Sequence, residues 1–430
     1  MNGRDPVVVV DGLRTPYTKA WGAFDDLPAD DLGRIVAAEI LTRMDLDGAE
    51  LDAVIFGNVA HPGDATNLSR VIALRAGIPQ EVPAHTVHRN CASGMESIAQ
   101  ADQLIRLGEA KVVLAGGVES MSNIPFLFSK RLQRWLMGLQ RAKRPADKVS
   151  AIARLRPAYL KPQIGLQMGL TDPVCGLNMG ETAEVLARDF GITREEQDRF
   201  AMESHNKTEA AIDAGRMAEE IVPVYPPPEF PAVVDDDGVR RGQSMAALAK
   251  LKPVFDRRYG TITAGNASQI TDGAAAVIVM HESDAKARGY RPLGRIVGWA
   301  FAGNEPARMG LGPVYATRKV LKKVGMKLAD FGLIEINEAF AAQVLACLRA
   351  CDSRDYFAQH FAGEEPLGAI DETKLNVNGG AVALGHPVGS SGTRLVITLL
   401  KEMRRRGVER GLATLCIGGG QGAAFVLEQG

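Results

Sequence analysis

Five cysteines and seven histidines are the side chains in this sequence best suited to nucleophilic or general-base chemistry. Cys91 lies in the segment His88-Arg-Asn-Cys-Ala-Ser-Gly94, between a predicted strand and the predicted start of a helix. The helix dipole and free backbone N–H groups at such a position lower the pKa of a thiol and favour the thiolate, which attacks carbonyl carbons. The same N–H groups could stabilise an oxyanion. A buried structural cysteine is the alternative interpretation.

A thiol nucleophile needs a base, and His386 is the best candidate. It lies in the glycine-rich segment 376–392, where the backbone can approach a substrate closely and Pro387 stiffens the turn. A histidine in such a loop can also be only a turn residue. His85 and His88 compete for the role because they lie near Cys91 along the chain, although nearness in sequence is not nearness in the fold.

Two further residues follow predicted strands. Cys416 begins the segment Cys-Ile-Gly-Gly-Gly-Gln-Gly422. A second thiol suits a reaction that removes a proton from carbon, because that step needs a base other than the acylated nucleophile. Asn337 could cap the helix that follows it, hold a water or donate to an oxyanion. A buried strand cysteine and a simple helix cap are the structural alternatives.

The elements that must position these residues alternate between short β-branched runs and helical patterns, which predicts an α/β fold. Predicted strands lie at residues 7–10, 53–56, 85–87, 112–115, 333–336, 374–377 and 413–416. Predicted helices lie at residues 31–44, 94–107, 337–347 and 391–405. Ser93 and Glu96 have the spacing of a capping box, and Gly108 can end the same helix. The repeated order, with residues 53–58 resembling 332–337, predicts two similar α/β halves.

The region between the halves differs in composition. It contains a basic stretch, consecutive prolines at 226–228 and an acidic turn at 235–237, which indicate an inserted loop domain over residues 123–252. The first half would then comprise residues 1–122 and 253–288, and the second half residues 289–430.

The overall composition narrows the class of protein. With 46% hydrophobic and 23% charged residues, the chain reads as a soluble globular protein, and no segment has the length of a membrane span. A formal net charge of -1 gives no case for nucleic-acid binding. The scattered, odd number of cysteines predicts a reducing, cytoplasmic setting.

These motifs resemble the thiolase family over essentially the full length of the chain. The matching segments are residues 14–16, 90–94, 116–121, 179–184, 263–268, 272–274, 337–340, 385–387 and 416–420. The resemblance implies a thiolase fold, in which two mixed-sheet α/β halves form α-β-α-β-α layers with an inserted loop domain. It also implies CoA-dependent cleavage of 3-ketoacyl-CoA to acetyl-CoA and a shortened acyl-CoA by a ping-pong mechanism, reversible as a Claisen condensation. A biosynthetic acetyl-CoA acetyltransferase that makes acetoacetyl-CoA is the alternative.

The resemblance further implies a role for each catalytic residue. Cys91 would be acylated after activation by His386, and Cys416 would move a proton on and off the α-carbon of acetyl-CoA. Asn337, through a water, and His386 would form one oxyanion hole. The amides of Cys91 and Gly418 would form the other.

The same family pattern implies a CoA site but no metal and no permanently bound cofactor, since CoA and acyl-CoA are substrates. The residues that match the pantetheine tunnel are Ser268, Ala264, Met179 and Phe340. Arg240, or its neighbour Arg241, would face the nucleotide end. The chain departs from many thiolases at Asn178, where histidine is common, which puts one CoA contact in doubt.

The segment 126–161 is longer than usual and holds ten Lys and Arg against a single acid, Asp147. Hydrophobic side chains fall on one helical face and basic side chains on another; they are Phe128, Leu132, Trp135, Leu136 and Leu139, against Lys130, Arg134 and Arg141. This segment resembles the thiolase subunit of fatty-acid β-oxidation complexes, where a helical insertion contacts membranes or a hydratase/dehydrogenase partner chain. A dimer contact and a site for CoA phosphates are the alternatives. Asn337 departs from such subunits, which often carry histidine there.

The family also implies a homodimer or a dimer of dimers. Three rival functions were weighed. An acyl-carrier-protein condensing enzyme would lack Cys416, a non-catalytic scaffold would lack Cys91 or His386, and a cysteine hydrolase would leave Cys416 unexplained.

Overall fold

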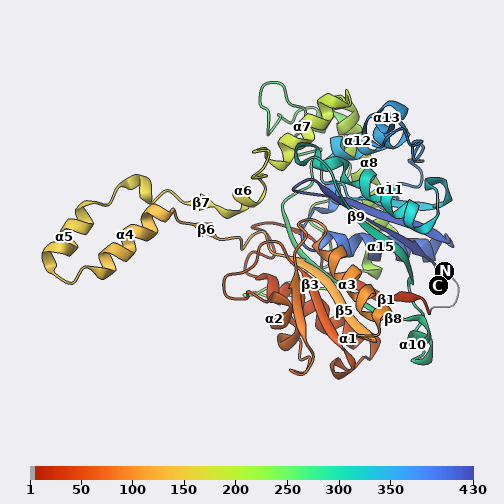
Figure 1. The fold of residues 1–430 in the computed structure, drawn as a ribbon, viewed down its shortest axis with the longest axis horizontal. Coiled ribbons are helices and arrows are strands. Elements are labelled where there is room, and N and C mark those ends of the chain that lie inside the picture. The colour runs from red at the N-terminus through yellow and green to blue at the C-terminus, as the bar shows by residue number, and fades with distance from the viewer. Residues whose placement is uncertain (1–4) are drawn as a thin grey trace. The chain divides into compact units, whose positions relative to one another are not determined.

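The computed structural model describes residues 5–430 (Figure 1). The strands are β1 Val7–Arg14, β2 Thr18–Lys19, β3 Ala53–Gly57, β4 Ala84–Val87, β5 Val112–Glu119, β6 Phe126–Leu127, β7 Gln163–Ile164, β8 Thr271–His281, β9 Gly294–Gly303, β10 Leu333–Ile336, β11 Arg410–Ile417 and β12 Gln421–Glu428. The helices are α1 Ala29–Met44, α2 Leu68–Arg75, α3 Ser93–Leu107, α4 Lys130–Arg141, α5 Pro145–Ala153, α6 Gly165–Gly169, α7 Met179–Asp189, α8 Arg194–Asp213, α9 Met245–Leu248, α10 Glu282–Ala287, α11 Gly312–Val324, α12 Ala341–Asp352, α13 Arg354–His360, α14 Ala381–Leu384 and α15 Ser391–Arg406. Short 3-10 helices lie at Gly48–Glu50, Pro157–Tyr159, Met217–Glu219, Pro306–Leu311 and Leu328–Asp330.

The main strands form two similar mixed sheets. The first has the order β1-β8-β5-β3-β4 and the second the order β9-β12-β11-β10. In both, the first two neighbouring pairs are antiparallel and the next is parallel. The sheets join where β1 and β9 pair Val8 with Arg295 and Val9 with Gly294. The predicted pair of similar mixed-sheet α/β halves is therefore confirmed.

The strand predicted at 374–377 does not form. Leu375 makes an isolated bridge, parallel to Ile334, and Val377 another to Gly379. The chain leaves the extended conformation at Asn376, whose φ is 44°. The Asn376 side chain then takes the place of a strand, because its Oδ1 accepts from Ile336 N at 2.8 Å and its Nδ2 donates to Ile336 O at 2.9 Å. The Asn376 side chain thus makes the hydrogen bonds to the edge of β10 that the backbone of a strand would have made.

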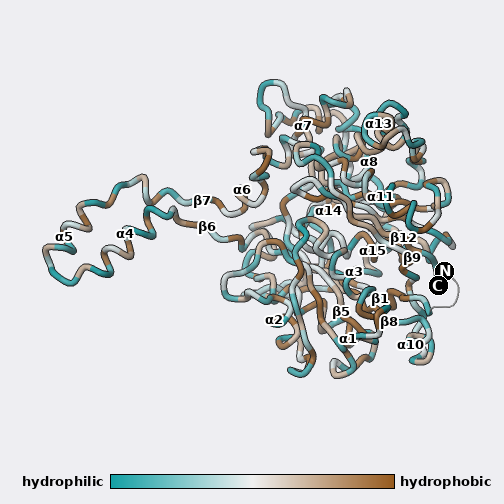
Figure 2. Tube along the Cα trace, viewed as in Figure 1, coloured by the Kyte–Doolittle hydropathy of each residue, from teal (hydrophilic) through white to brown (hydrophobic). Residues whose placement is uncertain are grey.

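Helices cover both faces of each sheet, which gives the α-β-α-β-α layering. Residues of α3 and α15 share one apolar core with inward side chains of both sheets. Helices α1 and α2 pack on the outer face of the first sheet, and α11 and α12 on that of the second. Figure 2 shows the hydrophobic character of β1, β5 and β8, which are buried along nearly their whole length. The two helices that follow the predicted nucleophile and base loops therefore lie in the central layer.

Contacts divide the chain into two compact units. The larger unit runs to Asn123 and resumes at Asp172–Gly430, and the smaller is Ile124–Thr171. Residues 172–252, which the composition grouped with an inserted domain, thus pack within the larger unit. The smaller unit ends at Thr171 rather than at residue 252 because α7 and α8 bury apolar and polar side chains against the second half. For example, Ser204 donates to Glu338 Oε2 at 2.6 Å.

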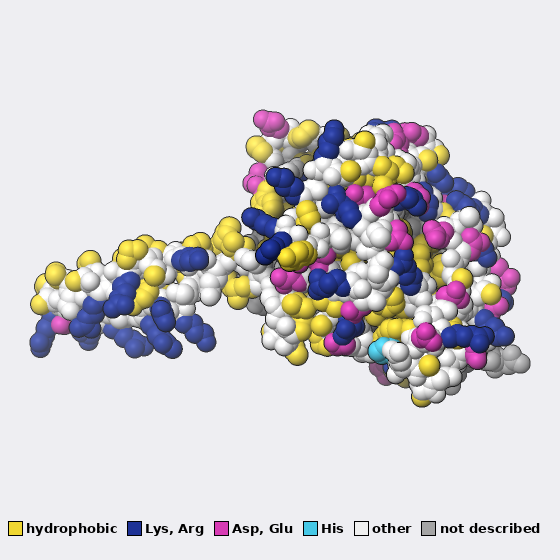
Figure 3. Space-filling view, turned by 90° about the horizontal axis from the view of Figure 1, so that it is seen from above, with side chains coloured by type: hydrophobic (Ala, Val, Ile, Leu, Met, Phe, Trp, Pro, Cys, Tyr) yellow, Lys and Arg dark blue, Asp and Glu magenta, His cyan; other side chains and the backbone are white. Residues whose placement is uncertain are grey.

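The smaller unit is a helical hairpin on a two-stranded ribbon. β6 and β7 pair antiparallel, Leu132 is buried, and Trp135 Nε1 donates to Ala151 O at 2.7 Å, joining α4 to α5. Basic side chains gather along one edge of this unit and hydrophobic ones along another (Figure 3). Its exposed hydrophobic residues include Phe126, Phe128, Leu136, Met137, Val149 and Ile152. No helix within residues 5–430 is both long and apolar enough to cross a membrane.

Candidate active site

Cys91 lies in the tight turn between β4 and α3. Asn90 has a φ of 45° and its Nδ2 donates to Gly418 O at 2.6 Å, which ties this turn to the loop after β11. The predicted capping box is wrong. Ser93 is the first residue of α3, and its hydroxyl accepts from Arg89 N at 2.9 Å and donates to Asn90 O at 2.7 Å. Ser93 therefore closes the turn around Cys91 rather than capping a helix with Glu96.

The sulfur of Cys91 meets backbone amides from both halves. Burial raises the pKa of the thiol, while hydrogen bonds from the backbone N–H groups of Gly418 and of Cys91 itself lower it, and nearby Glu119 raises it. The structure thus brings together at one sulfur the two amides predicted for an oxyanion hole. Since burial is the largest influence, the thiol is the resting form and needs a base to ionise.

Cys416 lies at the end of β11 and is buried. Burial raises its pKa well above the ordinary value, and the neighbouring Cys91 and Cys347 raise it further. The two predicted thiols are therefore close enough for a negative charge on Cys91 to raise the pKa of Cys416. Cys416 shares an apolar cluster with Met179 and Phe340, two of the residues predicted to line the pantetheine tunnel.

His386 is buried and held by hydrogen bonds on both ring nitrogens. Its Nδ1 lies 2.6 Å from Ser391 Oγ, which donates to Pro387 O at 3.0 Å. Because the hydroxyl has only one proton, this arrangement assigns the ring proton to Nδ1 and leaves Nε2 free to accept. Burial lowers the pKa of His386 to about 3, and the Arg394 charge lowers it further. The imidazole is thus neutral at rest, as a general base must be.

Asn337 is fully buried and does not cap α12. That helix begins at Ala341 with Phe340 as its N-cap, so the helix-cap interpretation is wrong. Asn337 Nδ2 lies 3.4 Å from His386 Nε2. Its Oδ1 is buried and has no hydrogen-bond partner among residues 5–430. Other buried polar atoms of the described residues share this state, including Asn58 Oδ1, so the feature that distinguishes Asn337 is its contact with His386.

The remaining tunnel residues lie around the segment that follows β10. Ser268 N donates to Ala339 O at 2.9 Å, and Ala267 bridges to Phe340. Phe340 also packs edge-on against Phe255, with centroids 6.2 Å apart. Ser268 is half-buried and Ala264 is exposed.

Met179 begins α7, directly after Asn178. The Asn178 side chain accepts from Gly180 N at 3.0 Å, and Glu181 completes a capping box. Asn178 is therefore a helix cap in this chain, which gives a structural reason for asparagine where many thiolases carry histidine.

Arg240 and Arg241 are both exposed but differ in their partners. Arg241 pairs with Asp213 at 2.8 Å and with Glu209 at 3.5 Å. Arg240 forms no ion pair with any residue of 5–430, and its backbone N–H donates to His205 Nδ1 at 3.1 Å. Arg240 is thus the arginine whose guanidinium remains free for a phosphate.

The competing histidines make other contacts, and His88 Nδ1 accepts from Asn90 N at 3.4 Å, directly before Cys91. His85 Nε2 hydrogen-bonds Gln100 Oε1 at 2.9 Å, and the His88 ring lies 5.7 Å from that of His61. Only His386 among the three candidates is joined to Asn337. The described residues contain no group of three or more His, Cys, Asp or Glu placed to hold a metal ion.

The sequence pattern predicted no role for two residues near this site. Ser391 holds His386, and Glu119 accepts from Gly389 N at 3.0 Å. Both stand in segments already singled out, 116–121 and 376–392. Their partners are distant in sequence or are backbone groups, so no spacing rule identifies them.

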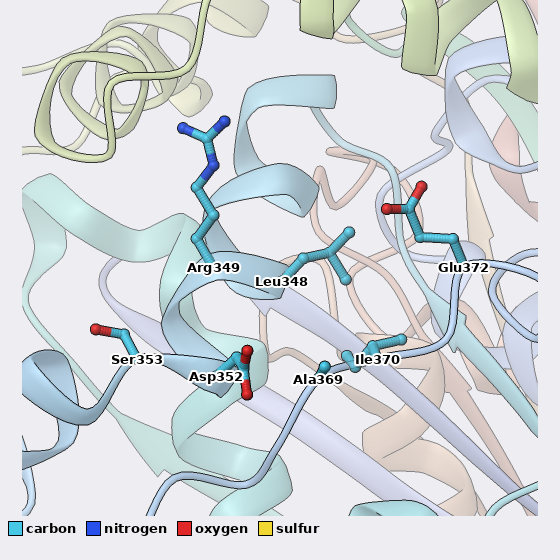
Figure 4. A pocket seen from close by; sticks show the side chains of 7 residues that line it. All are labelled: Leu348, Arg349, Asp352, Ser353, Ala369, Ile370 and Glu372. Carbon is cyan, nitrogen blue, oxygen red and sulfur yellow. The ribbon is translucent and has the colours of Figure 1, made fainter.

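A separate open pocket of about 390 Å³ lies at the end of α12 (Figure 4). Its lining residues are Leu348, Arg349, Asp352, Ser353, Ala369, Ile370 and Glu372. None of the predicted site residues is among them, and Arg349 is already bound by Glu196 and Phe190 O. This pocket is therefore not the site of the chemistry.

Comparisons with known proteins agree with this geometry. The family model for the thiolase N-terminal domain matches residues 7–283, and that for the C-terminal domain matches residues 290–429. A 3-ketoacyl-CoA thiolase of Yersinia pestis is 39% identical over 433 residues, covering 99% of this chain and 97% of the relative.

Solved structures show the same fold. The Bacillus anthracis acetyl-CoA acetyltransferase has a TM-score of 0.86 at 38% identity and covers 100% of both chains. Human mitochondrial 3-ketoacyl-CoA thiolase in complex with CoA has a TM-score of 0.84 at 38% identity, covering 99% of this chain and 98% of that one. With both domain models matched across nearly its whole length, this chain belongs to the thiolase family and is an acyltransferase of that family.

Proposed function

We propose that this thiolase cleaves 3-ketoacyl-CoA with free CoA, and that Cys91 carries the acyl group. The observation that carries this proposal is the pair of thiols. Cys416 is buried within range of the Cys91 charge, and Nε2 of a neutral His386 lies 3.4 Å from Asn337 Nδ2. A hydrolase would have no use for the second thiol, whereas cleavage between two carbons needs a group that protonates the departing carbon.

In the proposed first step, His386 Nε2 takes the proton of Cys91, and the Cys91 sulfur bonds to the 3-keto carbon of the substrate. The bond between C2 and C3 then breaks, and the thiol of Cys416 gives its proton to C2, which releases acetyl-CoA. In the second step the sulfur of free CoA attacks the acyl-Cys91 carbonyl, and the CoA thiol proton restores Cys416. The proton on His386 returns to Cys91 as it leaves.

Two sets of donors would stabilise the oxyanions of these steps. The N–H groups of Cys91 and Gly418, which both act on the Cys91 sulfur, would serve the carbonyl that this sulfur attacks. His386, once protonated, and a water held by Asn337 would serve the thioester oxygen of the acetyl-CoA enolate. The unpartnered Oδ1 of Asn337 supports this role.

CoA would enter along the apolar cluster that holds Met179 and Phe340, beside Ser268 and Ala264, with Arg240 at the phosphate end. The CoA complex of the human mitochondrial relative supports CoA as substrate. The Yersinia and human proteins are 3-ketoacyl-CoA thiolases, and the Bacillus anthracis protein is an acetyl-CoA acetyltransferase.

The deciding experiment is thiolysis of a 3-ketoacyl-CoA series, from acetoacetyl-CoA to a long-chain member, with purified protein and free CoA. Preference for long chains would assign the enzyme to fatty-acid degradation. Activity confined to acetoacetyl-CoA would make it an acetyl-CoA acetyltransferase. Failure to cleave any member would refute the proposal.

We also propose that the unit Ile124–Thr171 makes a peripheral contact with anionic membranes. Its basic edge and its exposed Phe126 and Phe128 support this contact, because basic and apolar side chains together favour an anionic lipid surface. A hydratase/dehydrogenase partner chain is the second candidate. Phe126→Ser with Phe128→Ser should reduce cosedimentation with anionic vesicles and leave acetoacetyl-CoA cleavage unchanged.

Tyr259→Ser is the control, since Tyr259 is also an exposed aromatic residue but belongs to the larger unit. Equal vesicle binding by the double variant and the control would refute the membrane contact. If pull-down of a hydratase/dehydrogenase chain falls instead, the partner candidate takes its place.

Finally, we propose a cytoplasmic homodimer or dimer of dimers. The five cysteines are all free, as a reducing compartment would keep them. Strand β4 ends the first sheet, and such an unpaired edge is where a second copy can pair. Light scattering on the purified protein distinguishes monomer, dimer and tetramer, and a monomer would refute this assignment.

A further inference from the structure

The loop that carries His386 is held mainly by the opposite half of the molecule. His386 N donates to Gln269 O at 3.2 Å, and Tyr17 OH lies 2.7 Å from Ser390 Oγ. Gly389 N donates to Glu119 Oε2 at 3.0 Å. The base of the reaction is thus positioned from the half that carries the nucleophile.

Glu119 is the charged member of these contacts. It is fully buried at the end of β5, and each of its oxygens accepts two hydrogen bonds. Oε1 accepts from Asn58 Nδ2 at 3.0 Å and Ala60 N at 2.9 Å, and Oε2 accepts from Val59 N and Gly389 N at 3.0 Å each. Four donors and no acceptor around one carboxyl group suit the ionised form, which only accepts. Burial raises the pKa of Glu119 to about 7, so this form dominates above that pH. The Glu119 side chain thus joins the loop after β3 to the His386 loop.

The two catalytic loops also meet backbone to backbone. A Cβ added at Gly117 would lie 2.1 Å from Gly389 O, and one at Gly94 would lie 2.9 Å from the same oxygen. Thr393 Oγ1 donates to Gly94 O at 3.2 Å, across the same contact. With no side chain between them, a small shift of the Gly389 backbone changes the relation between the start of α3 and the His386 loop directly.

We propose that Glu119 is a positioning residue for the reaction, whose carboxylate fixes the backbone at Gly389 and thereby the imidazole of His386 relative to Cys91. This inference rests on the proposed roles of Cys91 and His386. The path is short, because Gly389 lies between Pro387 and Ser391, whose oxygens fix the ring proton of His386. Loss of the carboxylate would let this loop drift while the CoA tunnel stays in place.

The test is Glu119→Gln, which keeps the shape of the side chain but turns an NH₂ group toward backbone donors. We expect kcat for thiolysis to fall about 10- to 100-fold, as for a misplaced catalytic group, with KM for CoA changing less than about threefold. Loss of the Glu119 charge alone would lower the Cys91 pKa and speed its alkylation by iodoacetamide, so a fall in the alkylation rate would report the misplaced His386. That second reading needs no substrate, so it remains informative if the enzyme does not cleave 3-ketoacyl-CoA.

Asp52→Asn is the matched control. Asp52 Oδ2 accepts from Lys111 N at 2.7 Å and Val112 N at 2.9 Å, at the other end of the same strand. It should affect stability but neither kcat nor alkylation. If Glu119→Gln folds and keeps kcat within about twofold of wild type, or if Asp52→Asn loses kcat to the same extent, the proposal is overturned.

Two further variants cover a Glu119→Gln protein that does not fold. Gly389→Ala disturbs the same contact from the other side, since its Cβ would lie 2.5 Å from Val118 O and 2.8 Å from Glu119 Oε2, and it should lower kcat and alkylation in the same way. Ser391→Ala removes the acceptor of the His386 ring proton. The double variant Gly389→Ala/Ser391→Ala should have a kcat no lower than that of the slower single variant, because both substitutions act through the imidazole of His386. Normal kcat in Gly389→Ala, or strictly multiplicative losses in the double variant, would overturn the proposal.

Discussion

The two halves of this thiolase share one strand order but differ where each sends its chain into the central helix. In the first half a turn of a few residues leads from β4 to α3 and exposes Cys91 at the helix start. In the second half the segment 376–390 separates the Leu375 bridge from α15 and carries His386 back toward the first half. In the proposed mechanism, the same frame therefore supplies a nucleophile on a short turn and a base on a long one.

Two asparagines at matching positions show the same difference between the halves. Asn58 follows β3 and Asn337 follows β10, which occupy matching places in the two sheets. Asn58 Nδ2 donates to Glu119, which holds the base loop, whereas Asn337 Nδ2 faces His386 itself. One position of the repeated frame thus serves support and its counterpart serves chemistry.

The largest expected effect tests the nucleophile of the first half. Cys91→Ala should lower thiolysis and condensation by at least about 10⁴-fold, because no other group can form the acyl intermediate. Mass spectrometry after incubation with acetyl-CoA should show no acylated protein. Cys175→Ala, at a free and half-buried cysteine outside the site, is the control and should behave as wild type. Turnover by Cys91→Ala would show that the first half does not supply the nucleophile.

The next effect tests the base of the second half. His386→Ala should lower kcat about 10²- to 10⁴-fold, whereas His85→Ala should not. Since the pKa of His386 is about 3, its neutral form is complete above that value and is lost only as the pH falls through it. The kcat/KM of the wild type should therefore show no His386 inflection between pH 5 and 8. An inflection near pH 6.5 that His386→Ala abolishes would contradict the buried, neutral imidazole.

A third test separates the two thiols. Cys416→Ala should lower condensation about 10²-fold or more, yet spare much of the acylation of Cys91 by acetyl-CoA, because acylation removes no proton from carbon. Acylation is followed by mass spectrometry and condensation by acetoacetyl-CoA formation. Equal loss of both would show that the thiols do not divide the work.

The smallest effect compares a buried carboxyl group in each half. Burial raises the pKa of Glu119 to about 7 and that of Glu335 to about 8, from an ordinary 4.5. Between 4.5 and the folded value, the folded state keeps a proton that the unfolded state has lost, so these groups lower stability as the pH rises.

In the wild type, the ionisation of Glu335 should lower Tm by about 2 °C as the pH rises to about 8, and Glu335→Gln should abolish this fall. The fall due to Glu119 should end near pH 7, and Glu119→Gln should abolish only that part. Scanning fluorimetry from pH 5 to 9 measures both slopes against wild type. Identical slopes in all three proteins would contradict the difference between the halves.

The sequence predicted the parts of this molecule that depend on local pattern. Strand runs such as Val7–Val10 and the helix that ends at Gly108 form as expected, and the motif order identified the family. The strand predicted at 374–377 does not form because the Asn376 side chain replaces it. The roles of Glu119 and Ser391 were missed because hydrogen bonds to backbone leave no residue pattern. The separation of Ile124–Thr171 depends on contacts that composition alone does not report.

The glycine contact at Gly94, Gly117 and Gly389 also affects how this enzyme can change in evolution. Because backbone meets backbone there, no substitution can adjust the spacing of nucleophile and base by small steps. We expect new substrate preferences to arise instead from side chains such as Met179 and Phe340, which belong to the apolar cluster of Cys416 outside that junction. The chemistry is thereby insulated from the variation that alters specificity, which lets one reaction persist while the acyl chains it accepts diverge.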